Sequence, residues 1–251
     1  MSTKNLHSTE FIKYEPNFKY AGKVNFHVKI ATDFVTNEAF KALRTNLLFA
    51  ANGCTSILVT SCDANDGKST ITTNIARSLA EINKKTILID ADMRNSTFLS
   101  SEKMSQILGL SEFLSEQANI SEIIYNTQDE NYDVIFSGKF PPNPSELLSS
   151  TRFKELLDVL KEYYDFVIID TPPVGLVTDA AVIASICDGA LLIISTGKTN
   201  LRQANWAKNQ LEKSRCKILG AILNESASKK GYYSKYRYRK RKYHYYKKHS
   251  S

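Results

Sequence analysis

The sequence has few cysteines, and none of them forms a recognisable pattern. Its 251 residues contain four, with no CxxC spacing and no nearby pair of histidines: Cys54, Cys62, Cys187 and Cys216. Structural zinc sites and small disulfide-bonded domains need closely spaced cysteines or histidines. We therefore expect ordinary reduced thiols in a cytosolic protein.

Long apolar runs are also missing. The N-terminus lacks the apolar core of a signal peptide, and no run approaches the ~20 residues that a membrane span needs. We therefore expect a soluble, cytoplasmic protein, which a partner would have to attach to any membrane. The length fits one α/β domain with tails.

Acidic residues are absent after Glu225, whereas ten of the 33 Lys and Arg residues lie there. The remainder of the chain has 23 basic and 26 acidic residues, a charge of −3 against +7 for the whole chain. The basic segment also holds seven of the thirteen tyrosines: Tyr232, Tyr233, Tyr236, Tyr238, Tyr243, Tyr245 and Tyr246. We predict a disordered tail over residues 227–251 that has an electrostatic partner.

Between an N-terminal arm (1–35) and this tail, residues 36–226 show the pattern of one α/β domain. Continuous Val, Ile and Leu runs predict buried parallel strands at 56–60, 86–90, 132–136, 166–170, 190–195 and 218–224. Helical spacing predicts helices at 37–50, 69–82, 144–164, 179–186 and 201–214, with short helices within 104–125. The alternation predicts a doubly wound, mostly parallel sheet of the P-loop NTPase type.

A Gly-Lys-Ser-Thr sequence between a predicted strand and a predicted helix indicates a phosphate-binding loop of the Walker A type. Backbone N–H groups at a helix start bind phosphate oxygens. Lys68 would pair with the β- and γ-phosphates, and the Ser69 hydroxyl would bind Mg²⁺. The expected nucleotide-binding residues of the loop are Asp63, Ala64, Asn65, Asp66, Gly67, Lys68, Ser69 and Thr70.

This loop departs from the strict GxxxxGK[ST] pattern. Cys62 occupies the position of the first glycine, and Asn65 a position where such loops often have glycine. Asparagine tolerates positive φ, so the turn can still form. The alternative is a Gly-Lys-Ser at the start of an ordinary helix. The chain's carboxylates argue against that alternative.

Carboxylates follow two of the other predicted strands. Asp90 and Asp92 stand at the end of one, and Asp170 ends another in the manner of a Walker B aspartate. Ligands of α/β sheets bind at the carboxyl ends of the strands. A lone aspartate there is usually a cap or turn residue, but three carboxylates beside a phosphate loop indicate a site for ATP and Mg²⁺.

These motifs together resemble the bacterial tyrosine kinases, P-loop proteins related to the MinD and ParA ATPases. The phrase PPNPSELL at 141–148 is typical of these kinases, and the similarity is strongest to the Gram-positive form found in capsule or exopolysaccharide operons. The resemblance implies catalytic roles for Lys68, Asp90 and Asp92, with Asp90 orienting or deprotonating the tyrosine hydroxyl. It also implies that Ser69, Asp92 and Asp170 bind Mg²⁺, and that Asn224 contacts adenine.

The resemblance further implies an assembly and partners. Glu38, Lys41 and Arg44 match an ExxRxxR oligomerisation helix, with lysine replacing the first arginine. The implied state is a homo-oligomeric ring in which the seven tail tyrosines are phosphoacceptors for a neighbour's active site. The implied partners are a membrane-embedded chain-length regulator that recruits the kinase to the inner face of the membrane, a protein-tyrosine phosphatase, and other tyrosine-phosphorylated proteins of polysaccharide synthesis.

Two alternatives remain open at the level of sequence. A switch ATPase like MinD or ParA would bind membrane or DNA through the basic tail, where tyrosines could stack on bases. The tyrosine cluster, the PPNPSELL phrase and the lack of a signature lysine between Asp63 and Asp66 argue against it, and no nucleic-acid partner is expected. The loop departures also allow an inactive kinase that acts as a scaffold.

Two further residues carry expectations. Trp206 is expected to be a packing residue, and oxidation of Cys62 is expected to block nucleotide binding.

Overall fold

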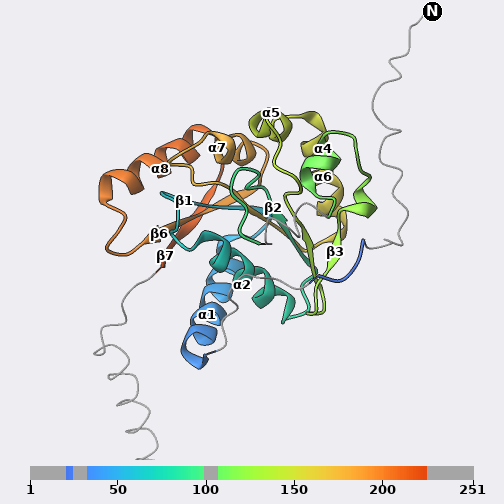
Figure 1. Ribbon diagram of the computed structural model, residues 1–251. Helices are drawn as coiled ribbons and strands as arrows, with labels where there is room; N and C mark the ends of the chain where they lie inside the picture. The colour runs from blue at the N-terminus through green and yellow to red at the C-terminus, as the bar shows by residue number, and fades with distance from the viewer. Residues whose placement is uncertain (1–20, 25–32, 99–106, 225–251) are drawn as a thin grey trace, which may run out of the picture.

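The computed structural model describes residues 21–24, 33–98 and 107–224. A seven-stranded sheet lies at its centre, in the order β3-β4-β2-β5-β1-β6-β7 (Figure 1). Its strands are β1 (Ser56–Ser61), β2 (Thr86–Asp90), β3 (Tyr125–Asn126), β4 (Tyr132–Ile135), β5 (Phe166–Asp170), β6 (Gly189–Ser195) and β7 (Ile218–Asn224). Neighbouring strands are parallel except β3 and β4. The predicted mostly parallel α/β sheet is confirmed.

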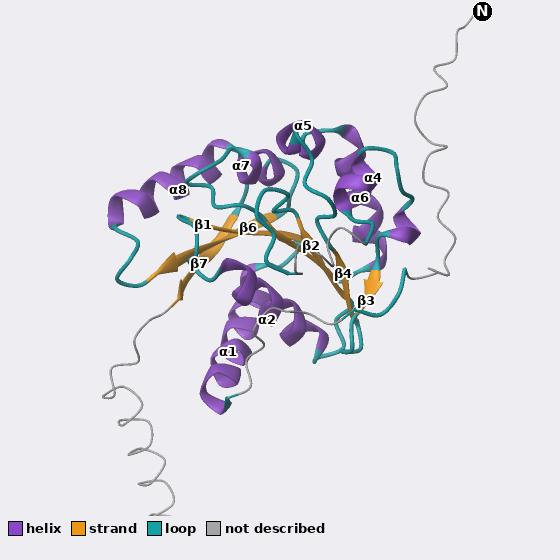
Figure 2. Cartoon of the chain, in the orientation of Figure 1, coloured by secondary structure: helices purple, strands orange, loops and turns teal. Residues whose placement is uncertain are grey.

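Helices cover both faces of the sheet. They are α1 (Phe34–Ala50), α2 (Lys68–Ala80), α4 (Leu110–Leu114), α5 (Pro144–Leu148), α6 (Thr151–Tyr163), α7 (Asp179–Ala184) and α8 (Leu201–Lys213), with a 3-10 turn, η1 (Ile120–Glu122). Helices α1 and α2 lie on one face, and α4 to α8 lie on the other (Figure 2).

The core consists of one apolar cluster on each face of the sheet. In β1, Ile57 and Val59 face the cluster beneath α1 and α2, whereas Leu58 faces the cluster beneath α6 to α8. All three side chains are fully buried. A strand covered on both faces needs apolar residues at every position, which is why these strands appear in the sequence as continuous apolar runs.

Two predictions of secondary structure were wrong. The helix predicted over 144–164 is two helices, because the Ser150 side chain caps α6 by accepting a hydrogen bond from the backbone N–H of Phe153. Residues 104–125 were expected to contain only short helices, but Tyr125 begins the antiparallel edge strand β3. That strand has two residues, too few to produce a periodic pattern.

At the amino end of the sheet, Asp188, which precedes β6, accepts hydrogen bonds from the start of β1. Its carboxylate accepts hydrogen bonds from the backbone N–H groups of Thr55 (3.0 Å) and Ser56 (2.8 Å), and from the Ser56 hydroxyl (2.9 Å). The Lys161 ammonium of α6 lies 3.0 Å from the other carboxylate oxygen. Asp188 therefore joins the start of β1 to β6 and α6.

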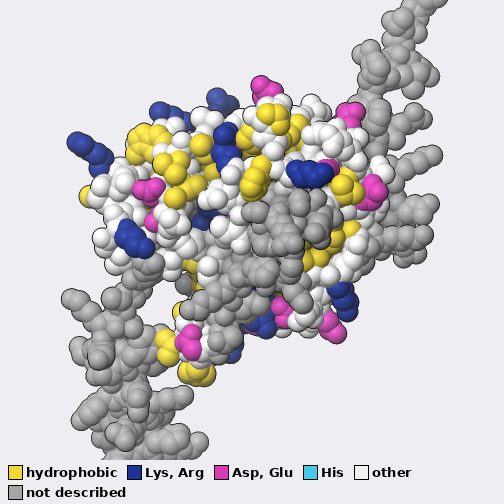
Figure 3. All heavy atoms as spheres, in the orientation of Figure 1, with side chains coloured by type: hydrophobic (Ala, Val, Ile, Leu, Met, Phe, Trp, Pro, Cys, Tyr) yellow, Lys and Arg dark blue, Asp and Glu magenta, His cyan; other side chains and the backbone are white. Residues whose placement is uncertain are grey.

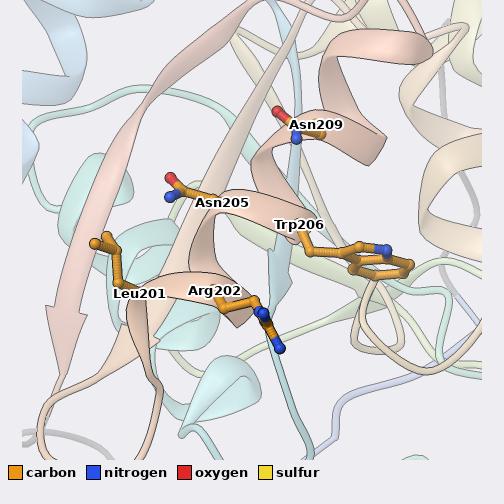
Figure 4. A pocket seen from close by; sticks show the side chains of 5 residues that line it. All are labelled: Leu201, Arg202, Asn205, Trp206 and Asn209. Carbon is orange, nitrogen blue, oxygen red and sulfur yellow. The ribbon is translucent and has the colours of Figure 1, made fainter.

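Helix α8 presents a tryptophan to solvent instead of packing it. Trp206 is 45% exposed, so the expectation that it is a packing residue was wrong. A shallow hollow of about 480 Å³ on this helix is lined by Leu201, Arg202, Asn205, Trp206 and Asn209 (Figure 4). Hydrophobic side chains are visible at the surface on the side of α8 (Figure 3). Among the described residues, the helices are too short or too polar to span a bilayer.

Candidate active site

The phosphate loop is shaped by two residues with positive φ. Asn65 has φ 61°, and Gly67, which immediately precedes α2, has φ 81°. A side chain at Gly67 would also collide with the Asn224 amide, whose Nδ2 donates a hydrogen bond to the Asp66 carbonyl at 2.7 Å. Gly67 is therefore required for its backbone conformation and for the close approach of Asn224. Asn65 takes the conformation that its tolerance of positive φ allows.

The carboxyl ends of β2, β5 and β1 bring the candidate residues together. Asp90 and Asp170 are paired in register across β2 and β5, and the phosphate loop follows β1. The Lys68 ammonium lies 2.9 Å from Oδ2 of Asp170 and 3.7 Å from Oδ2 of Asp92. The Ser69 hydroxyl donates to the same Asp170 oxygen at 2.7 Å.

Among the described residues, carboxylates outnumber cations at this end of the sheet. Burial alone would lower the pKa of Lys68, but Asp170 and Asp92 outweigh burial and raise it. Burial raises the pKa of Asp170, against the attraction of Lys68. Burial also raises the pKa of Asp90 to about 7, although the Ser96 hydroxyl donates to its carboxylate at 2.5 Å. The excess negative charge makes this a site that an additional cation would stabilise.

The oxygen atoms around Lys68 form a donor set that fits Mg²⁺. Oδ2 of Asp170, Oδ2 of Asp92 and Oγ of Ser69 lie 2.9, 3.7 and 3.4 Å from the Lys68 ammonium, which itself occupies a position suited to a cation. Mg²⁺ takes oxygen ligands, and nucleotide sites usually hold it with one or two carboxylates and the substrate phosphates. The residues present therefore fit the metal that the sequence predicted.

A cleft of about 450 Å³ opens beside these groups. The phosphate loop, the segment after β2 and the segment after β5 line it. The lining residues are Ser61, Asp63, Ala64, Asn65, Gly67, Lys68, Ser69, Thr70, Asp92, Arg94, Asn95, Thr97, Pro172, Pro173, Leu176 and Val177.

Cys62 is not among the residues that line the cleft. Its side chain is buried, and burial, followed by the charges of Asp66 and Asp63, raises the pKa of its thiol to about 11. A thiol of this kind reacts slowly, and the effect of its oxidation on nucleotide binding stays a prediction.

Four polar residues of the site were not identified from the sequence. The Thr72 hydroxyl donates to Oδ1 of Asp170 at 3.0 Å, and Ser96 donates to Asp90. Ser145 and Asp179 both bind Arg94. Thr72 lies one helical turn after Lys68, so helical spacing would have placed it beside the loop. The other three are brought in by loops and helices whose positions depend on the tertiary fold.

The predicted oligomerisation residues divide into two groups. Glu38 and Lys41 form an exposed ion pair at 2.9 Å on α1. The Arg44 side chain is 15% exposed and turns to α2, where its Nη1 donates to the backbone carbonyl of Ser78 at 2.6 Å. The seven tail tyrosines lie outside the described residues.

Comparisons with known proteins agree with this geometry. Residues 56–217 match the family model of the AAA domain. Tyrosine-protein kinase CpsD of Streptococcus agalactiae is 43% identical over 211 residues, which cover 82% of this chain and 92% of the relative. The kinase domain of the Escherichia coli tyrosine kinase ETK superposes with a TM-score of 0.71 at 35% identity, covering 76% of this chain and 77% of that domain.

The likeness to MinD is weaker. The septum site-determining protein MinD of Pyrococcus horikoshii, complexed with Mg-ADP, gives a TM-score of 0.57 at 25% identity and covers 69% of this chain and 71% of that one. The two proteins share the P-loop fold, whereas the relatives of higher identity are tyrosine kinases. The chain therefore belongs to the bacterial tyrosine-protein kinases, and its fold is that of the MinD-like P-loop ATPases.

Proposed function

We propose that this kinase transfers the γ-phosphoryl group of ATP to the seven tyrosines of its own C-terminal segment, in trans between copies. The observation that carries the proposal is the arrangement of Lys68 between Asp170 and Asp92 at the start of α2. A buried cation at a helix start, next to carboxylates at strand ends, matches the requirements of phosphoryl transfer. The rest of the chain supplies a dense group of phenols: Tyr232, Tyr233, Tyr236, Tyr238, Tyr243, Tyr245 and Tyr246.

The roles of the site residues follow from their chemistry. The backbone of residues 63–70 binds phosphate, with Lys68 on the β- and γ-phosphates. Ser69, Asp92 and Asp170 hold Mg²⁺, which supplies charge neutralisation for the phosphates when it is bound. Asn224 stands at the rim of the loop as an adenine contact.

Asp90 orients the tyrosine hydroxyl or accepts its proton. Its pKa of about 7, raised by burial, is compatible with proton acceptance near neutral pH. A phenol has a pKa of about 10, so its proton leaves late in the transfer and correct positioning matters more than a strong base.

We further propose that the kinase acts in the synthesis and export of a capsular or exopolysaccharide. A membrane-embedded chain-length regulator activates it and brings this cytoplasmic protein to the inner face of the membrane, and a protein-tyrosine phosphatase reverses the modification. Other tyrosine-phosphorylated proteins of polysaccharide synthesis are further substrates. The similarity to the Gram-positive kinases supports these roles.

A homo-oligomeric ring would present each tail to a neighbour, using the helix that carries Glu38, Lys41 and Arg44. Each phosphotyrosine adds about −1.5 to −2 charge, so seven would add roughly −10 to −14. That change cancels or reverses the ten positive charges after Glu225. Phosphorylated tails would then be repelled by the carboxylates of a neighbour's site, and the ring would dissociate.

The test compares the wild type with a variant in which all seven tail tyrosines are phenylalanine. Each is incubated with Mg-ATP, with and without the cytoplasmic segment of the activator, and phosphotyrosine is mapped by mass spectrometry. We expect nearly all autophosphorylation to disappear from the variant, while ATP hydrolysis and phosphorylation of an added tyrosine peptide persist. Tyr163→Phe, on α6, is the matched control and should leave phosphorylation unchanged. Abundant phosphotyrosine within 37–224 of the seven-site variant would contradict the assignment of the tail.

A further inference from the structure

Arg94 is held at the edge of the cleft by two residues from distant parts of the chain. Its Nε donates to Oδ2 of Asp179 at 2.7 Å, and its Nη2 donates to Oδ1 of Asp179 at 3.1 Å. Nη2 also donates to the Ser145 hydroxyl at 2.9 Å, which in turn donates to Oδ1 of Asp179 at 2.6 Å. The arrangement joins the segment after β2 to the first residues of α5 and α7.

The charges of this arrangement are fixed. The Asp179 side chain is fully buried, whereas that of Arg94 is 41% exposed. Burial alone would raise the pKa of Asp179, but its hydrogen bonds from Arg94 and Ser145 outweigh burial and lower it. The hydrogen bond to Asp179 raises the pKa of Arg94. At neutral pH the site therefore contains a guanidinium held in one orientation by two parallel hydrogen bonds.

The guanidinium keeps donors for a ligand in the cleft. Arg94 lines the same cleft as Lys68, Ser69 and Asp92. Among the described residues, the side-chain hydrogen bonds of Arg94 use Nε and Nη2, so Nη1 retains both of its N–H groups. A planar guanidinium with fixed orientation and unused donors is suited to bind phosphate oxygens.

We propose that Arg94 is a catalytic residue that contacts the γ-phosphoryl group during transfer, and that Asp179 and Ser145 are its positioning residues. The inference rests on the proposed function of the cleft. In the step concerned, the bond from phosphorus to the β-phosphate oxygen breaks as the bond to the tyrosine oxygen forms, ADP leaves, and the phenolic proton passes to Asp90 or solvent. Nη1 of Arg94 binds the oxygens on which negative charge collects, which lowers the barrier because the donor is already in place.

A comparison pair within the same protein distinguishes this role from simple stabilisation. Arg77 and Asp129 also form an ion pair, at 3.1 Å, but their side chains are 30% and 36% exposed. Neither residue lines the cleft. A variant that lacks the Arg77–Asp129 ion pair therefore shows how much stability and activity the protein loses with an Arg–Asp contact that does not bind phosphate.

The experiment compares Arg94→Gln, Arg94→Lys, Asp179→Asn and the control Arg77→Gln in the full-length kinase. Phosphorylation of a tyrosine peptide gives kcat and KM, and a fluorescent ADP gives nucleotide affinity. Trapping of ADP with Mg²⁺ and aluminium fluoride reports binding of the transferring group. We expect Arg94→Gln to lower kcat about 100-fold or more and to prevent trapping, with ADP affinity within about threefold of wild type.

The remaining variants sharpen the result. Arg94→Lys retains the charge but not the planar pair of bonds, so it should recover part of kcat. Asp179→Asn should lower kcat about tenfold with little change in the KM for ATP, because the guanidinium remains but is held less firmly. The control Arg77→Gln should keep kcat within about twofold of wild type.

Two outcomes would overturn the inference. One is wild-type kcat in Arg94→Gln; the other is a loss of ADP affinity and thermal stability in that variant that matches its loss of kcat, which would make Arg94 a structural residue. Failure of the proposed function itself is recognised separately, because the wild-type protein would then neither bind ADP nor phosphorylate the peptide.

Discussion

Aspartates lie at both ends of the sheet, and their burial and their hydrogen-bond partners differ between the two ends. At the amino end, Asp188 accepts hydrogen bonds from Thr55 and Ser56 and pairs with Lys161. At the carboxyl end, Asp90 and Asp170 are fully buried, and the buried Lys68 ammonium lies 2.9 Å from Asp170 and 3.7 Å from Asp92.

The direction of each pKa shift expresses this difference. Burial would raise the pKa of Asp188, but hydrogen bonds from Ser56 and Lys161 outweigh it and lower the pKa. Burial raises the pKa of Asp90 to about 7 and raises that of Asp170 as well. The Asp188 carboxylate at the amino end contributes stability through its lowered pKa. At the carboxyl end the pKa values of Asp90 and Asp170 stay raised in spite of their hydrogen bonds, an electrostatic cost that a positively charged ligand would relieve.

The largest expected effect comes from removing the lysine at the carboxyl end. Lys68→Met should reduce tyrosine phosphorylation by at least about 1,000-fold, since Lys68 is the one lysine among the described residues that lines the cleft. The protein should remain folded, as judged by circular dichroism. Lys161→Met, which removes the lysine of the amino end, is the matched control and should retain activity. A Lys68→Met protein that autophosphorylates at the wild-type rate would contradict the assignment of the loop.

The next effect concerns stability instead of activity. Asp188→Asn should lower the free energy of unfolding by about 2 kcal/mol at pH 7, because two backbone donors and one hydroxyl lose a charged acceptor. The folded-state pKa of Asp188 is depressed, so its contribution is present above the unfolded pKa of about 3.9 and is lost as pH falls through the folded pKa.

Urea unfolding at pH 7 and at pH 3 would measure this effect. The difference between wild type and Asp188→Asn should be smaller at pH 3 than at pH 7. A difference that is independent of pH would show that packing, and not the charge, is responsible. The kcat of the variant should stay close to that of wild type, since Asp188 lies at the opposite end of the sheet from the cleft.

The smallest effect is expected at the rim of the carboxyl end. Asn224→Ala removes the hydrogen bond to the Asp66 carbonyl and should raise the KM for ATP about fivefold, which corresponds to about 1 kcal/mol. Because the hydrogen bond supports the loop and not the transferring group, kcat should change less than KM. Steady-state kinetics would measure the changes in kcat and in the KM for ATP separately. An unchanged KM with a reduced kcat would show that Asn224 acts on the chemistry instead.

The strands and the main site residues were predictable from the sequence for a local reason. A strand buried on both faces has apolar residues throughout, and Lys68, Asp90 and Asp170 stand at fixed offsets from such strands. Asp179 and Ser145 were not found, because Asp179 lies 85 residues after Arg94 and only the tertiary fold brings the two together. The edge strand β3 was too short to predict.

The exposure of Trp206 could have been predicted from its spacing along the helix. Ala207 and Leu211 of α8 are four residues apart and form its buried face. Trp206 is offset by one residue from Ala207, or about 100° around the helix, which places it beside the buried stripe and not within it. Helical spacing measured from Leu211 would therefore have predicted partial exposure.

The contact between Asn224 and the phosphate loop sets a length scale for the proposed phosphoacceptors. Asn224 is fixed beside the loop, and Tyr232 follows it by eight residues, whereas Tyr246 follows by 22. At about 3.5 Å per residue, covalent geometry limits Tyr232 to about 28 Å from its anchor and Tyr246 to about 77 Å, whatever the path of the chain. The spacing between neighbouring active sites in an assembly thus limits which tail residues can bridge from one chain to the next. It determines which tyrosines of one chain can reach the next site, and a phosphorylation pattern that begins with the most distant tyrosines would report a wide spacing.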